Sequence, residues 1–329
     1  MQRRTPSGPE SSEPWAEPLA DAPLKLPTIV DDVAVIQEVV YASRVGYRPL
    51  TLDLYAPADA WDPVGGPASE RRYPAVVWIH GGAFRLGSKS LLPTFLEEAD
   101  FFRRLVRAGF VVAAIDYRLS SEARWPAQLL DVRAAIRWLR GRADEVGVST
   151  QAIAVWGESA GAHLAASAGI RGDRTHPDEE PYLPLPSVAA IVDWYGPSNF
   201  ALMDTQATVD ALQVHDAPDS PESVLLGAPV QQAPELVADA DPATHVASGC
   251  PPILIRHGVR DRLVPFGQSL HLASALERAG ADVRLRPVEG ADHVFEGHPR
   301  PVAFVDEAID FLREVMPSAS SRSILGTSR

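Results

Sequence analysis

The chain has 329 residues, of which 46% are hydrophobic, enough to bury the core of one large domain or two small ones. Its formal net charge of −13 argues against nucleic acid or an anionic membrane surface as the main partner, because both select a basic face. Cys250 is the only cysteine, which excludes an intramolecular disulfide, and we expect it to be a small buried apolar residue. No apolar run reaches the length of about 18 residues that a membrane span needs.

The two ends of the chain differ in composition from the rest. The N-terminal end is rich in Pro, Glu and Ser and lacks the apolar segment of a secretory signal. The C-terminal end is rich in Ser. We therefore predict disordered tails at 1–28 and 317–329 and a single domain at 29–316. A cytoplasmic location is the expectation that follows from a sequence with neither a signal nor a span.

The first part of the domain predicts a hairpin and then strands that alternate with helices. Apolar residues at every second position indicate the second hairpin strand. Two continuous apolar runs are typical of strands buried on both faces of a mostly parallel sheet. The elements predicted here are strands at 33–40, 50–55, 75–79 and 110–115 and helices at 92–108 and 126–142.

The second part returns to this alternation after an interruption. Short helical pieces between prolines fill residues 198–249, which we interpret as a lid inserted over the site. The regular elements predicted around it are strands at 188–192, 253–257 and 283–288 and helices at 265–279 and 302–316. Strands that alternate with helices predict an α/β fold, with a mostly parallel central sheet and helices on both of its faces.

A short glycine-flanked serine is the feature around which the rest is organised. Four apolar residues at 153–156 lead into Gly157-Glu158-Ser159-Ala160-Gly161, and an Ala-rich run follows. This pattern predicts a strand, a tight turn and a helix, the context of a nucleophile elbow with Ser159 at its apex. The alternative for an isolated motif is an ordinary glycine-rich turn with a helix-capping serine.

A serine hydroxyl needs a base within hydrogen-bond distance and a third group that orients the base. Asp261 follows one predicted strand and His293 follows the next, so both lie at strand ends on the same sheet edge as Ser159. We predict that Ser159 is the nucleophile, His293 the base and Asp261 the acid of a catalytic triad. His298 is the second choice for the base, and Asp292 is a poorer acid because adjacent side chains point apart.

Other polar residues are assigned structural roles. We expect His80 and His163 to hold loops together, His257 to be buried and hydrogen-bonded, and Asp131 to anchor a helix. Glu158 is either a carboxylate of the site or a solvent-facing or loop-bracing residue.

Paired glycines directly after a buried strand predict an oxyanion hole. We expect its donors to be the backbone N–H groups of Gly81, Gly82 and Ala160, with Ala83 as a further possibility. No His, Cys, Asp and Glu cluster has metal-ligand spacing and no phosphate-binding fingerprint occurs, so neither a metal nor a cofactor is expected.

Several separate motifs resemble one family. The chain is similar to the α/β-hydrolase esterases of the BD-FAE type, relatives of the hormone-sensitive-lipase-like carboxylesterases, over about residues 30–316. The similarity implies an α/β-hydrolase fold and hydrolysis of carboxylic esters. Two departures, Ala162 and Ala83, stand where related sequences often have glycine. The motifs are His80-Gly81-Gly82-Ala83-Phe84, Gly157-Glu158-Ser159-Ala160-Gly161, Asp116-Tyr117-Arg118-Leu119-Ser120, Trp125-Pro126-Ala127-Gln128, Asp193-Trp194-Tyr195-Gly196-Pro197 and Ser220-Pro221-Glu222-Ser223.

The resulting hypothesis is a serine carboxylesterase that acts on a small-molecule ester with a short acyl chain or an aryl group. The same residues would serve an amidase or arylformamidase, or an acyltransferase. A ligand-binding α/β-hydrolase without catalysis is the alternative from another class, although such proteins usually lack a triad member. The sequence does not fix the oligomeric state.

Overall fold

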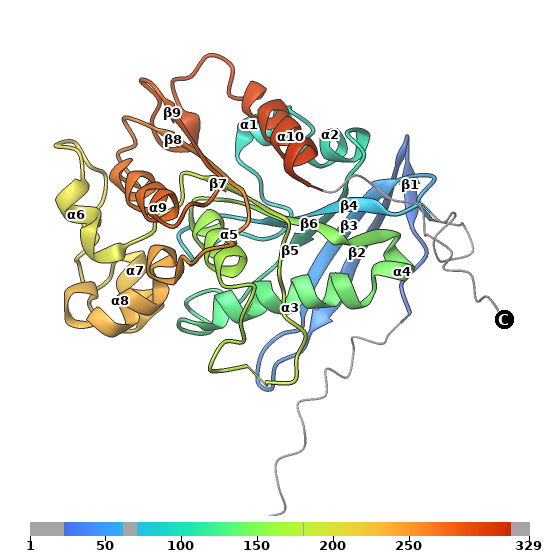
Figure 1. Cartoon of the computed structure of the whole chain (residues 1–329), viewed down its shortest axis with the longest axis horizontal. Helices are drawn as coiled ribbons and strands as arrows, with labels where there is room; N and C mark the ends of the chain where they lie inside the picture. The colour runs from blue at the N-terminus through green and yellow to red at the C-terminus, as the bar shows by residue number, and fades with distance from the viewer. Residues whose placement is uncertain (1–22, 62–70, 180, 317–329) are drawn as a thin grey trace, which may run out of the picture.

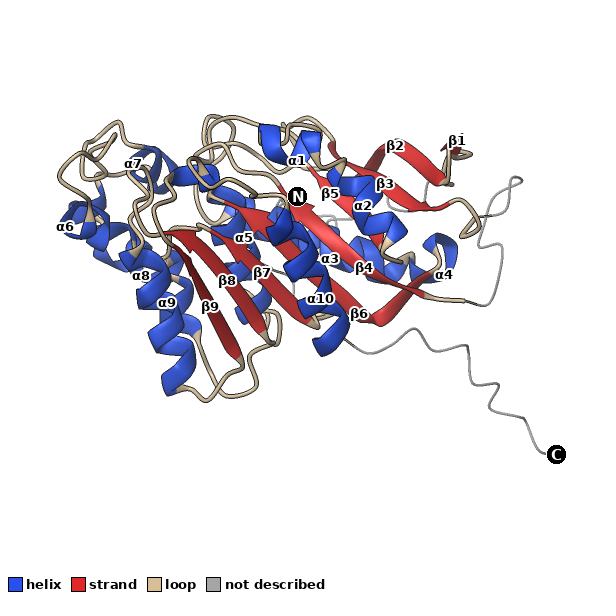
Figure 2. Ribbon diagram, turned by 90° about the horizontal axis from the view of Figure 1, so that it is seen from above, coloured by secondary structure: helices blue, strands red, loops and turns tan. Residues whose placement is uncertain are grey.

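The computed structural model of the chain describes residues 23–61, 71–179 and 181–316, and the two predicted tails fall mostly outside them. Figures 1 and 2 show one twisted sheet with helices on both faces. Its strand order is β1-β2-β3-β5-β4-β6-β7-β8-β9. The strands are β1 Thr28–Val30, β2 Val33–Ala42, β3 Leu50–Pro57, β4 Tyr73–Ile79, β5 Val111–Ile115, β6 Val148–Glu158, β7 Ala190–Trp194, β8 Ile253–Gly258 and β9 Val283–Val288.

The sheet has an antiparallel edge and a parallel body. Strands β1, β2 and β3 pair antiparallel, and β3 pairs antiparallel with β5. From β5 through β4, β6, β7 and β8 to β9 all pairs are parallel. The chain leaves β4 first to β5 on one side and then to β6 on the other. The carboxyl ends of β4 and β6 therefore lie side by side where the winding reverses, which is where α/β folds place their sites.

Helices connect the strands and cover both faces of the sheet. Figure 1 shows α1, α2 and α10 on one side and α3 and α5 on the other. The helices are α1 Thr94–Glu98, α2 Phe101–Arg107, α3 Ala127–Gly141, α4 Ala143–Val146, α5 Ala160–Ile170, α6 Met203–Gln206, α7 Pro221–Leu226, α8 Pro234–Ala240, α9 Gly267–Arg278 and α10 Ala303–Val315. Short 3₁₀ turns are η1 Phe200–Leu202, η2 Val230–Gln232, η3 Pro242–His245 and η4 His293–Phe295.

Each face of the sheet has its own hydrophobic core, because successive strand side chains point to opposite faces. On β4, Val77 belongs to the core that includes α3, α5 and α9, whereas Trp78 belongs to the core that includes α1, α2 and α10. Trp78, Trp156 and Trp194 stand on neighbouring strands and are fully buried. Trp156 contacts the other two in edge-to-face geometry, with ring centroids 6.3 and 4.8 Å apart. Burying one such side chain stabilises the fold by up to about 3 kcal/mol.

The fold confirms the predicted α/β-hydrolase class, and four details differ from the sequence analysis. The helix predicted at 92–108 is two helices, because Asp100 adopts a left-handed conformation with φ 49°, which aspartate tolerates better than most residues. The edge strand β1 was not predicted, since three residues carry no periodic signal. Leu24 packs against the core, so the ordered chain begins before residue 29. Cys250 is half-buried rather than buried.

The segment 198–249, which we call the cap, carries the short helices α6, α7 and α8 and lies beside α9 at one end of the sheet (Figure 1). Phe200, Met203, Leu225 and Leu226 are buried in the core that α3 and α5 share. Thus much of the cap's apolar content packs the insertion onto the body. No helix within residues 23–61, 71–179 and 181–316 is both long and apolar enough to cross a bilayer.

Candidate active site

Ser159 lies at the turn between β6 and α5, in a strained backbone conformation with φ 52° and ψ −121°. The two glycines of the motif make this turn possible. A Cβ on Gly157 would collide with the backbone of Gly161, and a Cβ on Gly161 would collide with the carbonyl oxygen of Ile79. Strain of this kind persists only where surrounding contacts enforce it, and it raises the serine side chain above the sheet edge.

His293 contacts both predicted partners. Its Nε2 is 3.1 Å from Ser159 Oγ, and its Nδ1 is 2.7 Å from Asp261 Oδ2. Because a carboxylate only accepts, Nδ1 carries the hydrogen and donates it to Asp261, which leaves Nε2 to accept from the serine hydroxyl. The three residues come from the ends of β6, β8 and β9. The structure thus brings together the three side chains that the sequence analysis selected.

Asp261 is fully buried and is held by its own loop. Its Oδ1 accepts hydrogen bonds from the backbone N–H groups of Leu263 and Val264, at 2.9 and 2.7 Å. Burial alone would raise the pKa of Asp261, but His293 and hydrogen bonds from His257 and His293 hold it well below its usual value. The carboxylate therefore stays ionised beside the imidazole.

His257 lies behind Asp261 and was predicted to be a buried, satisfied histidine. It is completely buried, and its Nε2 faces two acceptors, the Val264 carbonyl oxygen at 2.8 Å and Asp261 Oδ2 at 3.2 Å. Nε2 must then carry the hydrogen, and Nδ1 accepts from Ser269 Oγ at 2.7 Å. This residue supports the acid and does not contact the serine.

Glu158 is buried next to the nucleophile and braces the glycine loop. Its Oε1 accepts a hydrogen bond from the N–H of Gly81 at 2.6 Å. Burial raises the pKa of Glu158, against the opposing effects of His293, the Gly81 N–H and the Tyr195 hydroxyl. The sequence left two roles open for Glu158, and its contact with Gly81 favours loop bracing. Its carboxylate also raises the pKa of His293.

The pKa of His293 results from opposing influences. Burial lowers it, but the carboxylates of Asp261, Glu158 and Asp292 outweigh burial and raise the pKa above its usual value. Tyr195, which the sequence analysis did not select, packs its ring 4.8 Å from the imidazole, edge to face. Its position in the Asp193-Trp194-Tyr195-Gly196-Pro197 motif after a buried strand was the available signal.

One of the three predicted oxyanion donors is engaged elsewhere. Because the Gly81 N–H donates to Glu158, it is not free to donate to a substrate, and its predicted role is corrected to an anchor of the loop. Within the described residues, the N–H groups of Gly82, Ala83 and Ala160 donate no hydrogen bond. Gly82 and Ala83 have positive φ values of 109° and 53°, and a Cβ on Gly82 would collide with the backbone of Leu86.

The remaining polar candidates have structural contacts. Asp292 accepts from the backbone N–H of His293 and pairs with Arg262. The ring of His298 packs on Phe304 at a centroid distance of 4.7 Å. Asp131 is buried in a two-pronged contact with Arg118.

His80 and His163 bond to backbone carbonyl oxygens of loops, as expected. Ala162, one of the two departures from glycine, is buried against Gly196. Within the described residues, no hydrogen bond joins Ala83 or Ala162 to the side chains of the candidate triad.

A mostly parallel sheet with a serine at a strand-to-helix elbow and a histidine and an aspartate at later strand ends defines an α/β-hydrolase fold. The BD-FAE family model matches residues 52–276. The chain therefore belongs to the BD-FAE family, as the motifs predicted.

Curated relatives are similar over most of this chain. Esterase LipC of Mycobacterium tuberculosis is 32% identical over 225 residues, which is 68% of this chain and 53% of that protein. The probable carboxylic ester hydrolase LipM of the same organism is 26% identical over 293 residues, 86% of this chain and 62% of that protein. The chain thus spans only between half and two thirds of the length of these relatives.

Solved structures are similar over nearly their whole length. A truncated carbohydrate esterase from gut microbiota superposes with a TM-score of 0.69 at 28% identity, covering 89% of this chain and 98% of that one. Esterase 2 of the planctomycete Thermogutta terrifontis, with propionate bound, gives 0.63 at 29% identity, covering 84% and 93%. The same esterase phosphonylated by sarin gives 0.65 at 29% identity, covering 84% and 93%.

Proposed function

We propose that the protein is a serine carboxylesterase that hydrolyses short-chain or aryl carboxylic esters through an acyl-enzyme. The observation that carries this proposal is the hydrogen-bonded chain from Ser159 Oγ through His293 to the buried carboxylate of Asp261. Its position at a strained elbow, beside backbone N–H groups with no partner in the described chain, supports acyl transfer over a structural role. The esterases with similar sequences and structures support the same reaction.

The chemistry follows from the hydrogen-bond directions. Ser159 Oγ attacks the ester carbonyl carbon while its proton passes to His293 Nε2, and Asp261 stabilises the resulting imidazolium. The carbonyl oxygen becomes an oxyanion, for which the N–H groups of Gly82 and Ala160 are the proposed donors. When the tetrahedral intermediate collapses, the alcohol leaves with the proton from His293. Water then repeats the sequence on the acyl-enzyme and releases the carboxylic acid. Every proton moves between substrate, water and these side chains.

We propose that the cap sets substrate size through a few of its apolar side chains. Four of its apolar residues are buried in the core and are unavailable to a substrate. Leu202 and Val224 are half-buried, and Leu212 is 63% exposed, so these three remain as candidates for contact with an acyl or aryl group. A small-molecule ester as the partner, without nucleic acid, and a cytoplasmic location belong to the same proposal.

Replacing the nucleophile tests this function. Ser159→Ala should fold normally and lose roughly four to six orders of magnitude in kcat/KM for p-nitrophenyl acetate. An active-site fluorophosphonate should label the parent protein and leave the variant unlabelled. Ser167→Ala is a matched control, because Ser167 is buried on the same helix α5 and its hydroxyl has no hydrogen-bond partner within the described residues. Parent-like turnover in Ser159→Ala would exclude the proposed mechanism.

A further inference from the structure

The glycine loop that carries Gly82 ends in a buried lysine. We call residues 80–89 the oxyanion loop; it leaves the end of β4 at His80 and reaches Lys89. The Lys89 side chain is 8% exposed. Lys25 and Lys89 are the only lysines among the 30 lysine and arginine residues of the chain. The other 28 of these residues are arginines, and one of the two lysines occupies this buried position.

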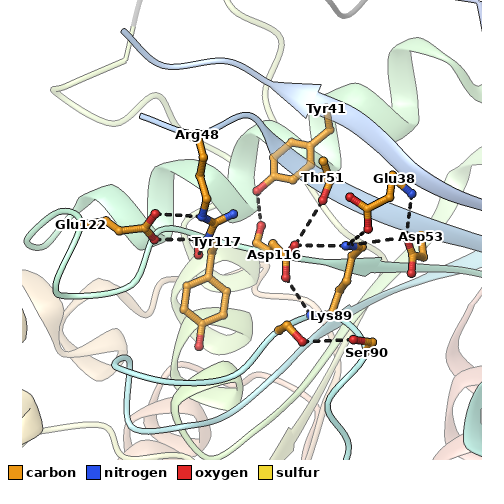
Figure 3. Close-up of polar contacts among 11 residues, drawn as sticks. Glu38, Tyr41, Arg48, Thr51, Asp53, Lys89, Ser90, Asp116, Tyr117 and Glu122 are labelled. Atoms are coloured by element: carbon orange, nitrogen blue, oxygen red, sulfur yellow. Dashed lines mark hydrogen bonds and ion pairs between the residues drawn. The ribbon is translucent and has the colours of Figure 1, made fainter. Parts of the chain in front are cut away.

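Three carboxylates surround the ammonium group of Lys89 (Figure 3). Nζ lies 2.6 Å from Glu38 Oε1, 3.2 Å from Asp116 Oδ2 and 3.8 Å from Asp53 Oδ1. The backbone N–H of Lys89 donates to Asp116 Oδ1 at 2.8 Å. An ammonium is a point charge with donors in several directions, whereas a guanidinium is a planar fork, so lysine suits this arrangement and arginine does not.

The carboxylates come from three strands of the sheet, β2, β3 and the end of β5. Glu38 interrupts the β2–β3 register and adopts φ 57°, and its N–H donates to Asp53 Oδ1 at 2.9 Å. The side chains of Asp53 and Asp116 are only 4% and 14% exposed. The end of the oxyanion loop is thus fixed, through one lysine, to the antiparallel edge of the sheet.

The segment that begins with Asp116 also contacts the start and middle of the same loop. The Tyr117 hydroxyl donates to the carbonyl oxygen of His80 at 2.9 Å, and the two rings stack at 4.4 Å. The N–H of Ser120 donates to the carbonyl oxygen of Phe84 at 2.8 Å. His80 and Phe84, which flank Gly82, are therefore both hydrogen-bonded to the segment that begins with Asp116. Lys89 contacts the same segment through Asp116.

A buried lysine among carboxylates is weak evidence for stability, because desolvation offsets much of the attraction. Directional contacts instead fix position, and an oxyanion donor must be held within a fraction of an ångström. We propose that Lys89 is a positioning residue that holds the oxyanion loop so that the Gly82 N–H points at the developing oxyanion. This inference rests on the proposed esterase function and assigns Lys89 no contact with the substrate.

Lys89→Met tests the inference, with Lys25→Met as the control at the other, exposed lysine. We expect Lys89→Met to lower kcat for p-nitrophenyl acetate by about 10- to 100-fold with KM nearly unchanged, because misplacing a catalytic group by 1 Å can cost about 10²-fold. The inhibition constant of a trifluoromethyl ketone, whose adduct places an oxyanion in the hole, should rise by the same factor. The acidic limb of the pH profile should not move, since the triad is intact.

A second variant keeps the test valid if Lys89→Met folds poorly. Glu38→Gln neutralises a carboxylate that is 61% exposed and weakens its contact with Lys89. It should lower kcat by about two- to fivefold and weaken binding of the ketone by the same factor. Either folded variant with parent-like kcat, or a lower kcat without loss of ketone affinity, would overturn the inference. Parent protein that hydrolyses no ester would instead refute the proposed function, so the two failures are distinguishable.

Discussion

The oxyanion loop and the cap both belong to the region of the candidate site, but apolar burial contributes more to the attachment of the cap. The oxyanion loop is fixed by directional contacts: Gly81 to Glu158, His80 to Tyr117 and Lys89 to three carboxylates. The cap combines apolar burial, through side chains such as Phe200 and Leu225, with ion pairs of Asp239 with Arg171 and of Asp241 with His271. The ring of Phe200 in the cap stacks on the ring of His163, with 4.9 Å between the ring centroids.

The difference reflects what each region has to control. Apolar burial is non-directional and tolerates changes of shape that keep volume, so a cap can vary while it stays attached. Hydrogen bonds to charged groups fix atoms along particular directions, which a donor to a transition state requires. Substitutions in the loops that surround Ser159 should therefore change rate, whereas substitutions in the cap should change stability or substrate preference.

Among the side chains that support Ser159, the largest effect is expected from Asp261, which contacts His293. Asp261→Asn should lower kcat by about 10⁴-fold, because an amide favours the wrong imidazole tautomer and removes the charge that stabilises the imidazolium. Asp292→Asn is a matched control next to the same histidine and should cost far less, since Asp292 bonds to the backbone N–H groups of His293 and Arg262 and to the Arg262 side chain and not to the imidazole. Kinetics with p-nitrophenyl acetate measure both. Equal losses in the two variants would show that Asp261 is not the orienting acid.

A smaller effect is expected from Glu158, which connects the glycine loop and the base. Glu158→Gln keeps an acceptor for the Gly81 N–H but removes a carboxylate that raises the pKa of His293. The base works as neutral imidazole, so activity is present above the pKa of His293 and is lost as pH falls through it. The substitution should lower the pKa of His293, so the acidic limb of the pH profile of kcat/KM should move to lower pH.

The plateau rate of Glu158→Gln should fall by no more than about tenfold, because a charge-assisted hydrogen bond exceeds a neutral one by only ~1 kcal/mol. Glu314→Gln, at an exposed carboxylate on α10, is the control and should leave the limb in place. An acidic limb that stays fixed in Glu158→Gln would show that this carboxylate does not act on the base.

The smallest effects are expected in the cap. Leu212→Ser and Val224→Ser should change the relative rates on acetate, butyrate and octanoate esters by about tenfold while acetate hydrolysis changes little. This is the low end of the ~1–3 kcal/mol that one methylene is worth in an apolar pocket, because neither side chain is fully buried. Leu225→Ala, at a buried neighbour, should lower stability by ~2–5 kcal/mol without altering these ratios. Thermal melts and the ester series separate the two effects. Unchanged ratios in both serine variants would place specificity outside the cap.

Local sequence patterns were sufficient to predict the α/β class, most element positions and the three side chains, Ser159, His293 and Asp261, that the structure joins by hydrogen bonds. Strand and helix periodicity are local properties, and the elbow glycines mark a turn wherever they occur after a buried strand. The rule that parallel strands present their carboxyl ends at one edge then brings Asp261 and His293 to the serine without knowledge of distances. The distances of 2.7 Å from His293 Nδ1 to Asp261 Oδ2 and of 3.1 Å from His293 Nε2 to Ser159 Oγ agree with that reasoning.

Long-range packing settles which glycine N–H has no partner within the described residues and what holds the oxyanion loop. Gly81 and Glu158 are 77 residues apart, and no periodic pattern pairs a particular backbone N–H with a particular carboxylate. Lys89 likewise meets Glu38 and Asp116 across 51 and 27 residues. Such contacts depend on strand order, on the irregular register at Glu38 and on the path of the loop. These features arise from packing of the whole sheet and not from any local run of residues.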